Sequence, residues 1–468
     1  MKRSFTHFLI LFFMVLRIVV LTSCANIIPP GGGPRDSLPP RLVITSPKDS
    51  AVGVSVLQQN FNLMFDEYVT LDNVLSALIV SPTLPNSPKV LSKLRNVTIS
   101  LKDTLEPNTT YSFNFGDAIK DVNEGNIARG ITYIFSTGRT IDYNTYGGKI
   151  LLAETGKVDS SMLVVLHKNL SDTAVIKLRP RYYTRLNGRG EFMFHNLPAG
   201  DFSVYAIGKE SFAKKYDDST LLFAFRNSPV SIGANTTPDT LYAFEAFKRK
   251  IGTSSIAPVK LPGNADKRLR YTVDLETGKQ DLLNDMNLLF TRKLTAFDST
   301  KFVLSDTNYN RIQGYSVSLD TNKTKVTLKY KWKEATPFSL IIAKDAAADS
   351  AGNTLSKADT VRFFTKKETD YGSIRLRFTN LDLSKNPVLQ FVQNDKIIES
   401  YPLTLAEFSR KMYRPGTYDL RILFDTNKNG VWDTGRFPVN KQQPEIVFLI
   451  PKQLVIRSNW DNEVTIEL

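Results

Sequence analysis

Apolar and polar residues alternate in short runs along most of the chain, with turn-forming residues between the runs. Residues 61–65 (FNLMF) and 97–101 (VTISL) are two such runs, and their period of two is typical of half-buried β-strands. No run has the spacing of three to four residues that marks an amphipathic helix. The pattern therefore predicts an all-β chain. Its 468 residues predict several domains, because a single hydrophobic core stops growing at about 250–300 residues.

Two long segments share an internal order of motifs, and they span residues 41–140 and 270–368. Tyr111 and Gly125 in the first have the same separation as Phe338 and Gly352 in the second. Each glycine is followed by Asn, and both residue types suit the left-handed backbone of a turn. In this order of motifs, closed by Phe-Ser-Thr or Phe-Phe-Thr, both segments resemble the bacterial Ig-like domain. The resemblance implies a β-sandwich for each.

The remaining segments, 141–247 and 369–468, share a different signature. Each contains a turn with Pro and Gly that leads into an aromatic residue and a strand, at residues 198–202 and 415–418. They resemble the prealbumin-like sandwich of carboxypeptidase regulatory-like domains. We therefore predict a tandem array of four β-sandwich domains in which two Ig-like and two prealbumin-like domains alternate, with a linker at 248–269.

The amino terminus is typical of a lipoprotein signal peptide, which we predict at residues 1–23. Two basic residues precede an apolar run at 8–21, which is too short to span a bilayer comfortably. The run ends in a sequence that resembles a lipobox, namely Leu21, Thr22, Ser23 and Cys24. Cys24 is the only cysteine, so no disulfide can form within the chain. We predict Cys24 as the lipid attachment site and the Pro- and Gly-rich residues 24–40 as a tether.

Together these features resemble the Ig-like-domain lipoproteins of the Bacteroidetes type. The resemblance implies a protein of the cell envelope that is held to the membrane by its lipid. No Asp or Glu lies between Cys24 and Asp36, which departs from the acidic signal associated with surface display. We therefore expect a lipid-anchored protein at the periplasmic face of the outer membrane, with surface display as the alternative.

Composition and motifs argue against nucleic-acid binding and catalysis. The net charge of +14 is spread along the chain without a Lys/Arg block, so we expect no nucleic-acid partner. The sequence has no Gly-x-Ser-x-Gly motif and no phosphate-binding loop. His167 and His195 lack metal-ligand spacing, and we interpret both as surface or turn residues. We therefore predict that the chain is not an enzyme and has no catalytic residues.

Acidic residues supply one alternative to this prediction. A glycoside hydrolase needs a pair of carboxylates, and the candidates are Asp66, Glu67, Asp117, Asp121 and Glu124. Their positions at strand ends and turns favour a structural role, because sandwich hydrolases need clefts that no long insertion here supplies.

The sharpest local motif lies at residues 425–433 (DTNKNGVWD). It matches the first nine positions of an EF-hand-like calcium loop, with candidate ligands Asp425, Asn427, Asn429, Val431 and Asp433. Arg436 occupies position twelve, where a bidentate acid is expected, so any Ca2+ binding should be weak unless a distant carboxylate completes the shell. The alternative is a hairpin turn with Trp432 packed beneath it.

Two kinds of binding function are compatible with these observations. The first is a structural or protein-interaction module of the cell envelope. The second is a glycan-binding lipoprotein for polysaccharide capture, with Tyr182, Tyr183 and Trp432 as stacking platforms. The identity of the protein or glycan partner stays open.

Overall fold

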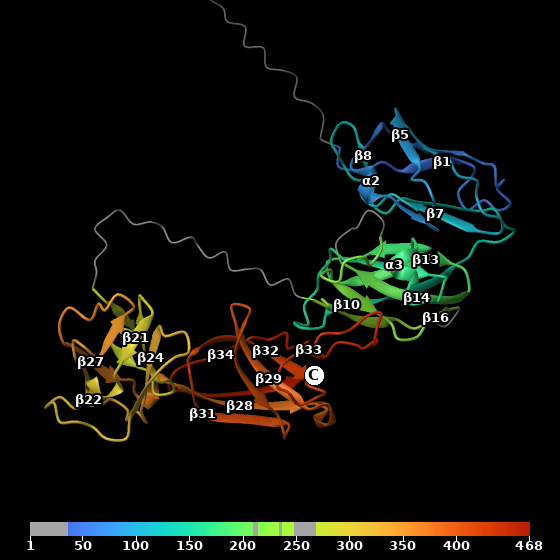
Figure 1. Ribbon diagram of the computed structural model, residues 1–468. Coiled ribbons are helices and arrows are strands. Elements are labelled where there is room, and N and C mark those ends of the chain that lie inside the picture. Colours follow the sequence, from blue (N-terminus) through green and yellow to red (C-terminus); the bar gives the residue numbers. More distant parts are fainter. Residues whose placement is uncertain (1–35, 209–213, 234–235, 248–267) are drawn as a thin grey trace, which may run out of the picture. The chain divides into compact units, whose positions relative to one another are not determined.

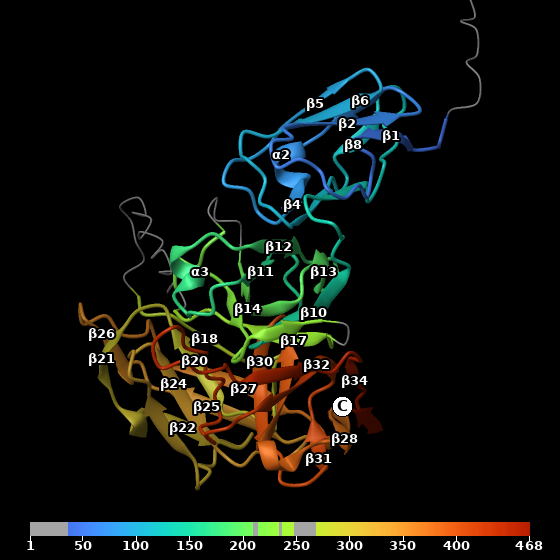
Figure 2. The same cartoon turned by 90° about the vertical axis from the view of Figure 1, so that its right-hand side faces the viewer.

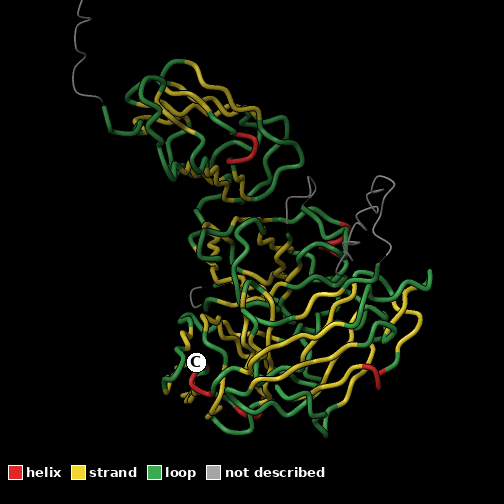
Figure 3. Tube along the Cα trace, turned by 90° about the vertical axis from the view of Figure 1, so that its left-hand side faces the viewer, coloured by secondary structure: helices red, strands yellow, loops and turns green. Residues whose placement is uncertain are grey.

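The computed structural model describes residues 36–208, 214–233, 236–247 and 268–468. The predicted signal peptide, the lipobox with Cys24, most of the tether and nearly all of the linker lie outside these residues. Strands and their connections make up almost all of the described chain, and the α-helices α2 (Val74–Ala77) and α3 (Ala174–Lys177) have four residues each (Figure 3). The all-β fold class is therefore confirmed. No described helix is long and apolar enough to cross a membrane.

Contacts divide the chain into two compact units rather than four. The first comprises residues 1–144 with 196–198, and the second comprises 145–195 with 199–468. We refer to strands β1–β9 as module 1, β10–β17 as module 2, β18–β27 as module 3 and β28–β35 as module 4 (Figure 1). Module 1 forms the first unit, whereas modules 2, 3 and 4 belong to the second. The predicted boundaries of four separate domains stay predictions.

Module 1 contains three sheets, with strand orders β1-β2-β6-β5, β4-β7-β9 and β3-β8. Its strands are β1 (Leu42–Ser46), β2 (Asn60–Phe65), β3 (Val69–Leu71), β4 (Ile79–Ser81), β5 (Lys89–Lys93), β6 (Asn96–Ser100), β7 (Thr110–Asn114), β8 (Ile119–Asp121) and β9 (Thr132–Ser136). In β2 the residues Phe61, Leu63 and Phe65 are fully buried, while those between them are exposed. The alternation in the sequence thus places one face of this sheet on the core.

Module 3 repeats this arrangement, with strand orders β18-β20-β24-β23, β19-β27-β25-β22 and β21-β26. Its strands are β18 (Tyr271–Val273), β19 (Lys279–Gln280), β20 (Met286–Phe290), β21 (Leu294–Phe297), β22 (Phe302–Ser305), β23 (Ser316–Leu319), β24 (Lys325–Lys329), β25 (Pro337–Ile342), β26 (Ala347–Asp349) and β27 (Asp359–Thr365). Apart from β19, each strand has a counterpart in module 1 with the same neighbours. Module 1 has a parallel bridge, Ala51 to Phe135, where β19 pairs with β27. The repeated motifs therefore correspond to a repeated topology.

Modules 2 and 4 share a second topology. Figure 2 labels several strands of each module. The strands of module 2 are β10 (Asn144–Leu152), β11 (Leu163–His167), β12 (Tyr182–Arg185), β13 (Glu191–Leu197), β14 (Gly200–Ile207), β15 (Phe223–Phe225), β16 (Val230–Ile232) and β17 (Asp239–Ala243). Those of module 4 are β28 (Gly372–Thr379), β29 (Pro387–Gln393), β30 (Lys396–Pro402), β31 (Glu407–Tyr413), β32 (Gly416–Phe424), β33 (Ile446–Leu449), β34 (Leu454–Ile456) and β35 (Asp461–Glu467). In each module the last strand pairs in parallel with the first, and the eight strands correspond one to one.

The central strands of modules 2 and 4 depart from simple alternation. All five residues of β11 are buried, and so are six of the seven residues of β29. A strand buried on both faces needs a second layer of protein over its outer face. Over β29 that layer includes the connection between β32 and β33, whose Trp432 packs against Val388.

Candidate functional site

The connection between β32 and β33 runs from residue 425 to residue 445 and contains the predicted calcium loop. Module 2 has a shorter connection at the same topological position, between β14 and β15. We call residues 425–433 the calcium-loop motif and residues 434–443 the clasp. Both segments place functional groups at the junction between modules 2 and 4.

The calcium-loop motif folds into a turn in which the predicted ligand side chains converge. The Asp425 carboxylate is buried and accepts hydrogen bonds from the Asn429 and Gly430 backbone N–H groups at 3.2 and 2.7 Å. The side-chain amides of Asn427 and Asn429 donate to Asp433 Oδ2 at 2.6 and 2.8 Å. Gly430 has φ of 77°, which the turn requires and glycine adopts readily. Val431 lies in the same turn with an exposed side chain.

Glu445 supplies a further carboxylate, which the sequence reasoning did not identify. It is buried, and its side chain accepts hydrogen bonds from the Thr426 and Asp433 backbone N–H groups at 2.7 and 3.1 Å. The motif lacks an acid at Arg436, and Glu445 lies nine residues further along the chain, in the β33 connection. No motif spacing could have identified it, because the second half of the connection positions it. It is the distant carboxylate that the predicted loop would need.

A cavity of about 200 Å3 adjoins this turn. Its lining residues are Thr426, Asn427, Asp433, Thr434, Arg436, Gln442 and Glu445. Within the described parts of the chain, no group of three or more His, Cys, Asp or Glu side chains is placed to hold a metal ion. The carboxylates of Asp425 and Glu445 instead bond to backbone N–H groups of the turn. Calcium binding therefore stays a prediction.

The alternative role for Trp432 agrees with the structure. Its ring is half-buried against Val388, Leu423 and Val447 on the outer face of the module 4 sheet, and its Nε1–H donates to the Glu445 carbonyl at 2.7 Å. The calcium-loop motif therefore covers β29, β32 and β33.

The clasp carries Phe437 onto an aromatic surface of module 2. The Phe437 ring centroid lies 4.7 Å from that of Phe223 and 5.2 Å from that of Phe225. Tyr205 and Tyr216 meet the same ring edge-on at 5.7 and 6.3 Å. Tyr216 belongs to the β14–β15 connection, so the equivalent connections of the two modules meet here. Such aromatic contacts contribute about 0.5–1.5 kcal/mol per pair beyond the apolar area that they bury.

Polar contacts fix the clasp on both sides of Phe437. Thr434 Oγ1 donates to the Glu245 carbonyl at 2.6 Å, and Gln443 Nε2 donates to the Phe225 carbonyl at 2.9 Å. Lys441 Nζ forms an ion pair with Asp172 at 2.8 Å and lies 5.2 Å from the ring centroid of Phe225. Hydrogen bonds to backbone carbonyls fix the register of the contact and also add to its strength.

Glycines allow the closest approaches between the modules. A Cβ on Gly435 would lie 2.7 Å from ring carbons of Phe244, and one on Gly156 would lie 2.8 Å from the Leu449 backbone nitrogen. Beside Gly156, the Val447 N–H donates to the Ala153 carbonyl at 2.8 Å. Modules 2 and 4 therefore touch through backbone as well as side chains, although module 3 separates them in the sequence.

Module 3 is joined to module 4 by a polar cluster. Asp281 accepts a hydrogen bond from Arg414 Nε at 2.9 Å and another from the Tyr371 hydroxyl at 3.0 Å. Burial is the largest single influence on Asp281 and opposes its ionisation, but the hydrogen bonds from Arg414, the Leu283 backbone N–H and Tyr371, together with the charge of Arg414, lower the pKa of the carboxyl below its usual value. Arg414 Nη2 also donates to Asn284 Oδ1 at 2.5 Å.

The structure corrects the interpretation of His167. This residue is buried rather than at the surface, and its Nε2 has no hydrogen-bond partner among the described residues. Its ring meets Tyr205 edge-on at 5.9 Å, directly behind the surface that receives Phe437. Burial lowers the pKa of His167 to about 4, so the ring is neutral at pH 7. His195 is exposed, as expected.

The structure also corrects the glycan-stacking hypothesis. Tyr182 and Tyr183 have 3% and 9% of their surface exposed, and Trp432 is half-buried beneath its own loop. A stacking platform must present an open ring face, so these three rings do not form one.

Two of the acidic candidates of module 1, Asp66 and Asp121, have structural partners. Asp121 is buried and accepts hydrogen bonds from the backbone N–H groups of Glu124, Gly125 and Asn126 at 2.6–2.8 Å. Asp66 pairs with Arg41 at 3.0 Å. Burial and the nearby carboxylates, Asp121 first, raise the pKa of Glu67. The arrangement serves the turn after β8.

In module 3 an ion pair takes the place of the neighbouring acids Glu67 and Asp121 of module 1. Asp349 accepts backbone hydrogen bonds in the equivalent turn and is paired with Arg292 at 2.9 Å. Its hydrogen bonds from Asn353 and Arg292 lower the pKa of the Asp349 carboxyl. The two modules share this turn, but the charged residue beside it is Glu67 in module 1 and Arg292 in module 3.

Comparisons with known proteins agree with the fold of the first unit. A family model described as a bacterial Ig-like domain matches residues 36–137, which contain all of module 1. This confirms an Ig-like domain in this part of the chain. No curated protein matches the chain.

Several solved structures have a low similarity to the chain. The Bacillus anthracis TIE protein is 10% identical, with 94% of this chain and 75% of that chain covered and a TM-score of 0.17. BcpA, the major pilin subunit of Bacillus cereus, is 9% identical, with 69% and 99% covered and a TM-score of 0.16. The S-layer protein rSbsC(31-844) is 12% identical, with 91% and 54% covered and a TM-score of 0.15.

Proposed function

We propose that the chain is a lipid-anchored, non-enzymatic scaffold of the bacterial cell envelope that holds a protein partner. The observation that carries this proposal is the clasp, which joins module 2 to module 4 through Phe437 and backbone hydrogen bonds. A chain of loosely tethered modules needs no such contact. Modules held together in this way present their loops at fixed separations, which is what a scaffold requires.

The acidic residues support a role without catalysis. Asp121 uses its carboxylate to hold a turn, and Asp66 is paired with Arg41. A glycosidase would need one free nucleophile or base and one acid on either side of a substrate. Of the carboxylates considered for that chemistry, Asp66 and Asp121 are committed to local structure.

The membrane anchor is part of the same proposal. Acylation of Cys24 would fix the amino terminus in a bilayer, and residues 24–40 would separate it from module 1. We place the protein at the periplasmic face of the outer membrane. Ca2+ bound by the calcium-loop motif would add cross-links within the connection that carries the clasp.

Metabolic labelling of growing cells with radioactive palmitate tests the anchor. The unchanged chain should incorporate label and sediment with membranes, whereas Cys24→Ser should be unlabelled and soluble. Membrane association of Cys24→Ser equal to that of the unchanged chain would contradict the proposal.

A further inference from the structure

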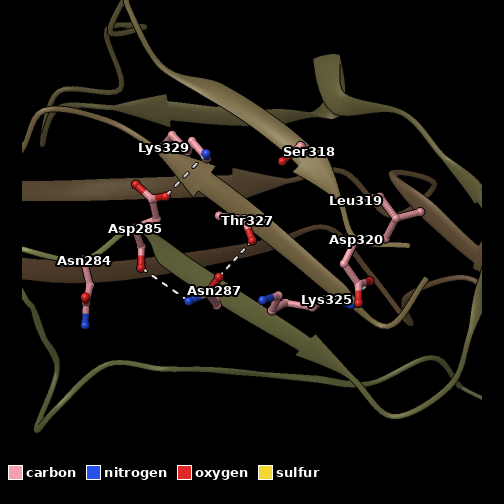
Figure 4. Close-up of a pocket in the computed structure, with 9 residues that line it drawn as sticks. All are labelled: Asn284, Asp285, Asn287, Ser318, Leu319, Asp320, Lys325, Thr327 and Lys329. Atoms are coloured by element: carbon pink, nitrogen blue, oxygen red, sulfur yellow. Dashed lines mark hydrogen bonds and ion pairs between the residues drawn. The ribbon is translucent and has the colours of Figure 1, made fainter. Parts of the chain in front are cut away.

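A cavity lies on the outer face of a module 3 sheet. Its volume is about 530 Å3, and Figure 4 shows it across strands β20, β23 and β24. Its lining residues are Asn284, Asp285, Asn287, Ser318, Leu319, Asp320, Lys325, Thr327 and Lys329. We call this surface the polar groove.

The floor of the polar groove is a row of three short polar side chains. Asn287, Thr327 and Ser318 lie opposite one another in the register of β20, β24 and β23. Thr327 Oγ1 donates to Asn287 Oδ1 at 2.9 Å, and Asn287 Nδ2 donates to Asp274 at 2.7 Å. These bonds orient the amide and the hydroxyl before any ligand arrives, which lowers the entropy cost of binding.

Module 1 has the same row without the short third residue. Asn62 pairs with Thr98, whose hydroxyl donates to Asn62 Oδ1 at 2.8 Å, as in module 3. Leu91 occupies the position of Ser318 and is 55% exposed. The Asn–Thr pair is therefore common to both Ig-like topologies. Ser318 distinguishes the module 3 face by leaving space and a hydroxyl where module 1 has an isobutyl group.

The charges of the polar groove balance. Asp285 and Lys329 lie at one end, 3.9 Å apart, and Asp320 and Lys325 line the other. Two carboxylates and two ammonium groups give the lining no net charge, so it has no preference for a polyanion or a polycation. Amides, hydroxyls and paired charges offer both donors and acceptors, which is the chemistry that recognises hydroxyl groups.

We infer that the polar groove binds a neutral saccharide chain through hydrogen bonds rather than through ring stacking. An extended peptide would instead add to the free edge of β23, because β23 ends its sheet and edge strands bind peptides through their backbone. The groove floor consists of side chains on the face of the sheet, which favours the saccharide. This site goes beyond the scaffold role and does not depend on it.

Electrophoresis of the purified full-length protein through gels that contain neutral glucan, mannan or galactan tests the inference. At least one polysaccharide should retard the protein. Ser318→Leu copies the module 1 face and should reduce the retardation, with a rise of about tenfold in the Kd derived from it. Thr327→Val should also raise this Kd. Both variants place β-compatible side chains on an outer strand face, so circular dichroism should be unchanged.

Matched variants in module 1 provide the control. Leu91→Ser and Thr98→Val change the equivalent positions and should leave the retardation intact. Three results would overturn the inference: no retardation by any neutral polysaccharide, retardation that survives Ser318→Leu, or binding only to polyanions that 0.5 M NaCl abolishes. Binding of extended peptides that Ser318→Leu leaves intact, without saccharide binding, would overturn the inference and point to the free edge of β23 as a peptide site instead.

Discussion

Modules 2 and 4 have the same strand topology, but the connection between their fifth and sixth strands differs. In module 2 the chain passes from β14 to β15 through a loop that contributes Tyr216, whereas in module 4 it passes from β32 to β33 through the calcium-loop motif and the clasp. The shorter loop forms part of a receiving surface, and the longer one inserts Phe437 into it. A repeated sandwich can therefore become a pair of complementary partners when a single loop is extended.

Acid should lower the stability of module 2, the module that receives Phe437. Burial lowers the pKa of His167 from its ordinary value of 6.5 to about 4 in the folded protein, so as pH falls the unfolded chain takes up the proton first. The contribution of neutral His167 to the free energy of unfolding is therefore complete above pH 6.5 and is lost between pH 6.5 and 4. We expect a loss of about 3 kcal/mol, measured as the free energy of unfolding in urea at each pH. His167→Phe should flatten the profile in this range, and an unchanged profile would contradict the assignment.

Removal of the Phe437 ring should weaken the contact between the clasp and module 2. Phe437→Ala should destabilise the contact by about 2 kcal/mol, since the half-buried ring loses its four aromatic partners. Scanning calorimetry should show modules 2 and 4 unfolding together in the unchanged protein and separately in the variant. The exposed Val439, two residues away, provides a control, because Val439→Ala should leave the single transition intact.

Calcium should sharpen the difference between the two connections. At about five times its Kd, Ca2+ should stabilise the second unit by about 1 kcal/mol. Asn427→Asp adds a formal negative charge to the motif and should tighten binding, whereas Asp433→Asn should weaken it. Isothermal titration would show this order of affinities. Equal affinities in all three proteins would rule out the predicted ligand set.

The smallest effect is expected at the rim of the junction. Lys157 and Asp395 form an ion pair at 2.6 Å, and that hydrogen bond lowers the pKa of Asp395. Both side chains are largely exposed, so salt screens the pair. Lys157→Met should cause the smallest shift in melting temperature of the series, and 0.5 M NaCl should remove the difference from the unchanged protein.

Local patterns in the sequence predicted the strands and their repetition. Alternation in β2 specified a half-buried strand, and the turns at Gly125 and Gly352 use the positive φ that glycine allows. The family match at residues 36–137 confirms the Ig-like resemblance of module 1. These features depend on neighbours in sequence, which is why the sequence predicts them.

The junction depends on contacts between distant residues, and the sequence analysis missed it. Phe437 lies in a loop without periodicity, and nothing beside it indicates that modules 2 and 4 meet. One signal was present: residues 162–166 (MLVVL) form a continuous apolar run instead of an alternating one. A run of this kind indicates burial on both faces and therefore a second covering layer. The same reasoning would have placed His167, which directly follows this run, in the interior.

The proposed scaffold function requires modules 2 and 4 to form one body. Spin labels at Lys168→Cys and Lys452→Cys, both exposed positions, in a Cys24→Ser background would report the distance between these modules by double electron–electron resonance. The account predicts one narrow distance distribution that broadens when Phe437→Ala is added. A broad distribution in the protein with an intact clasp would contradict it.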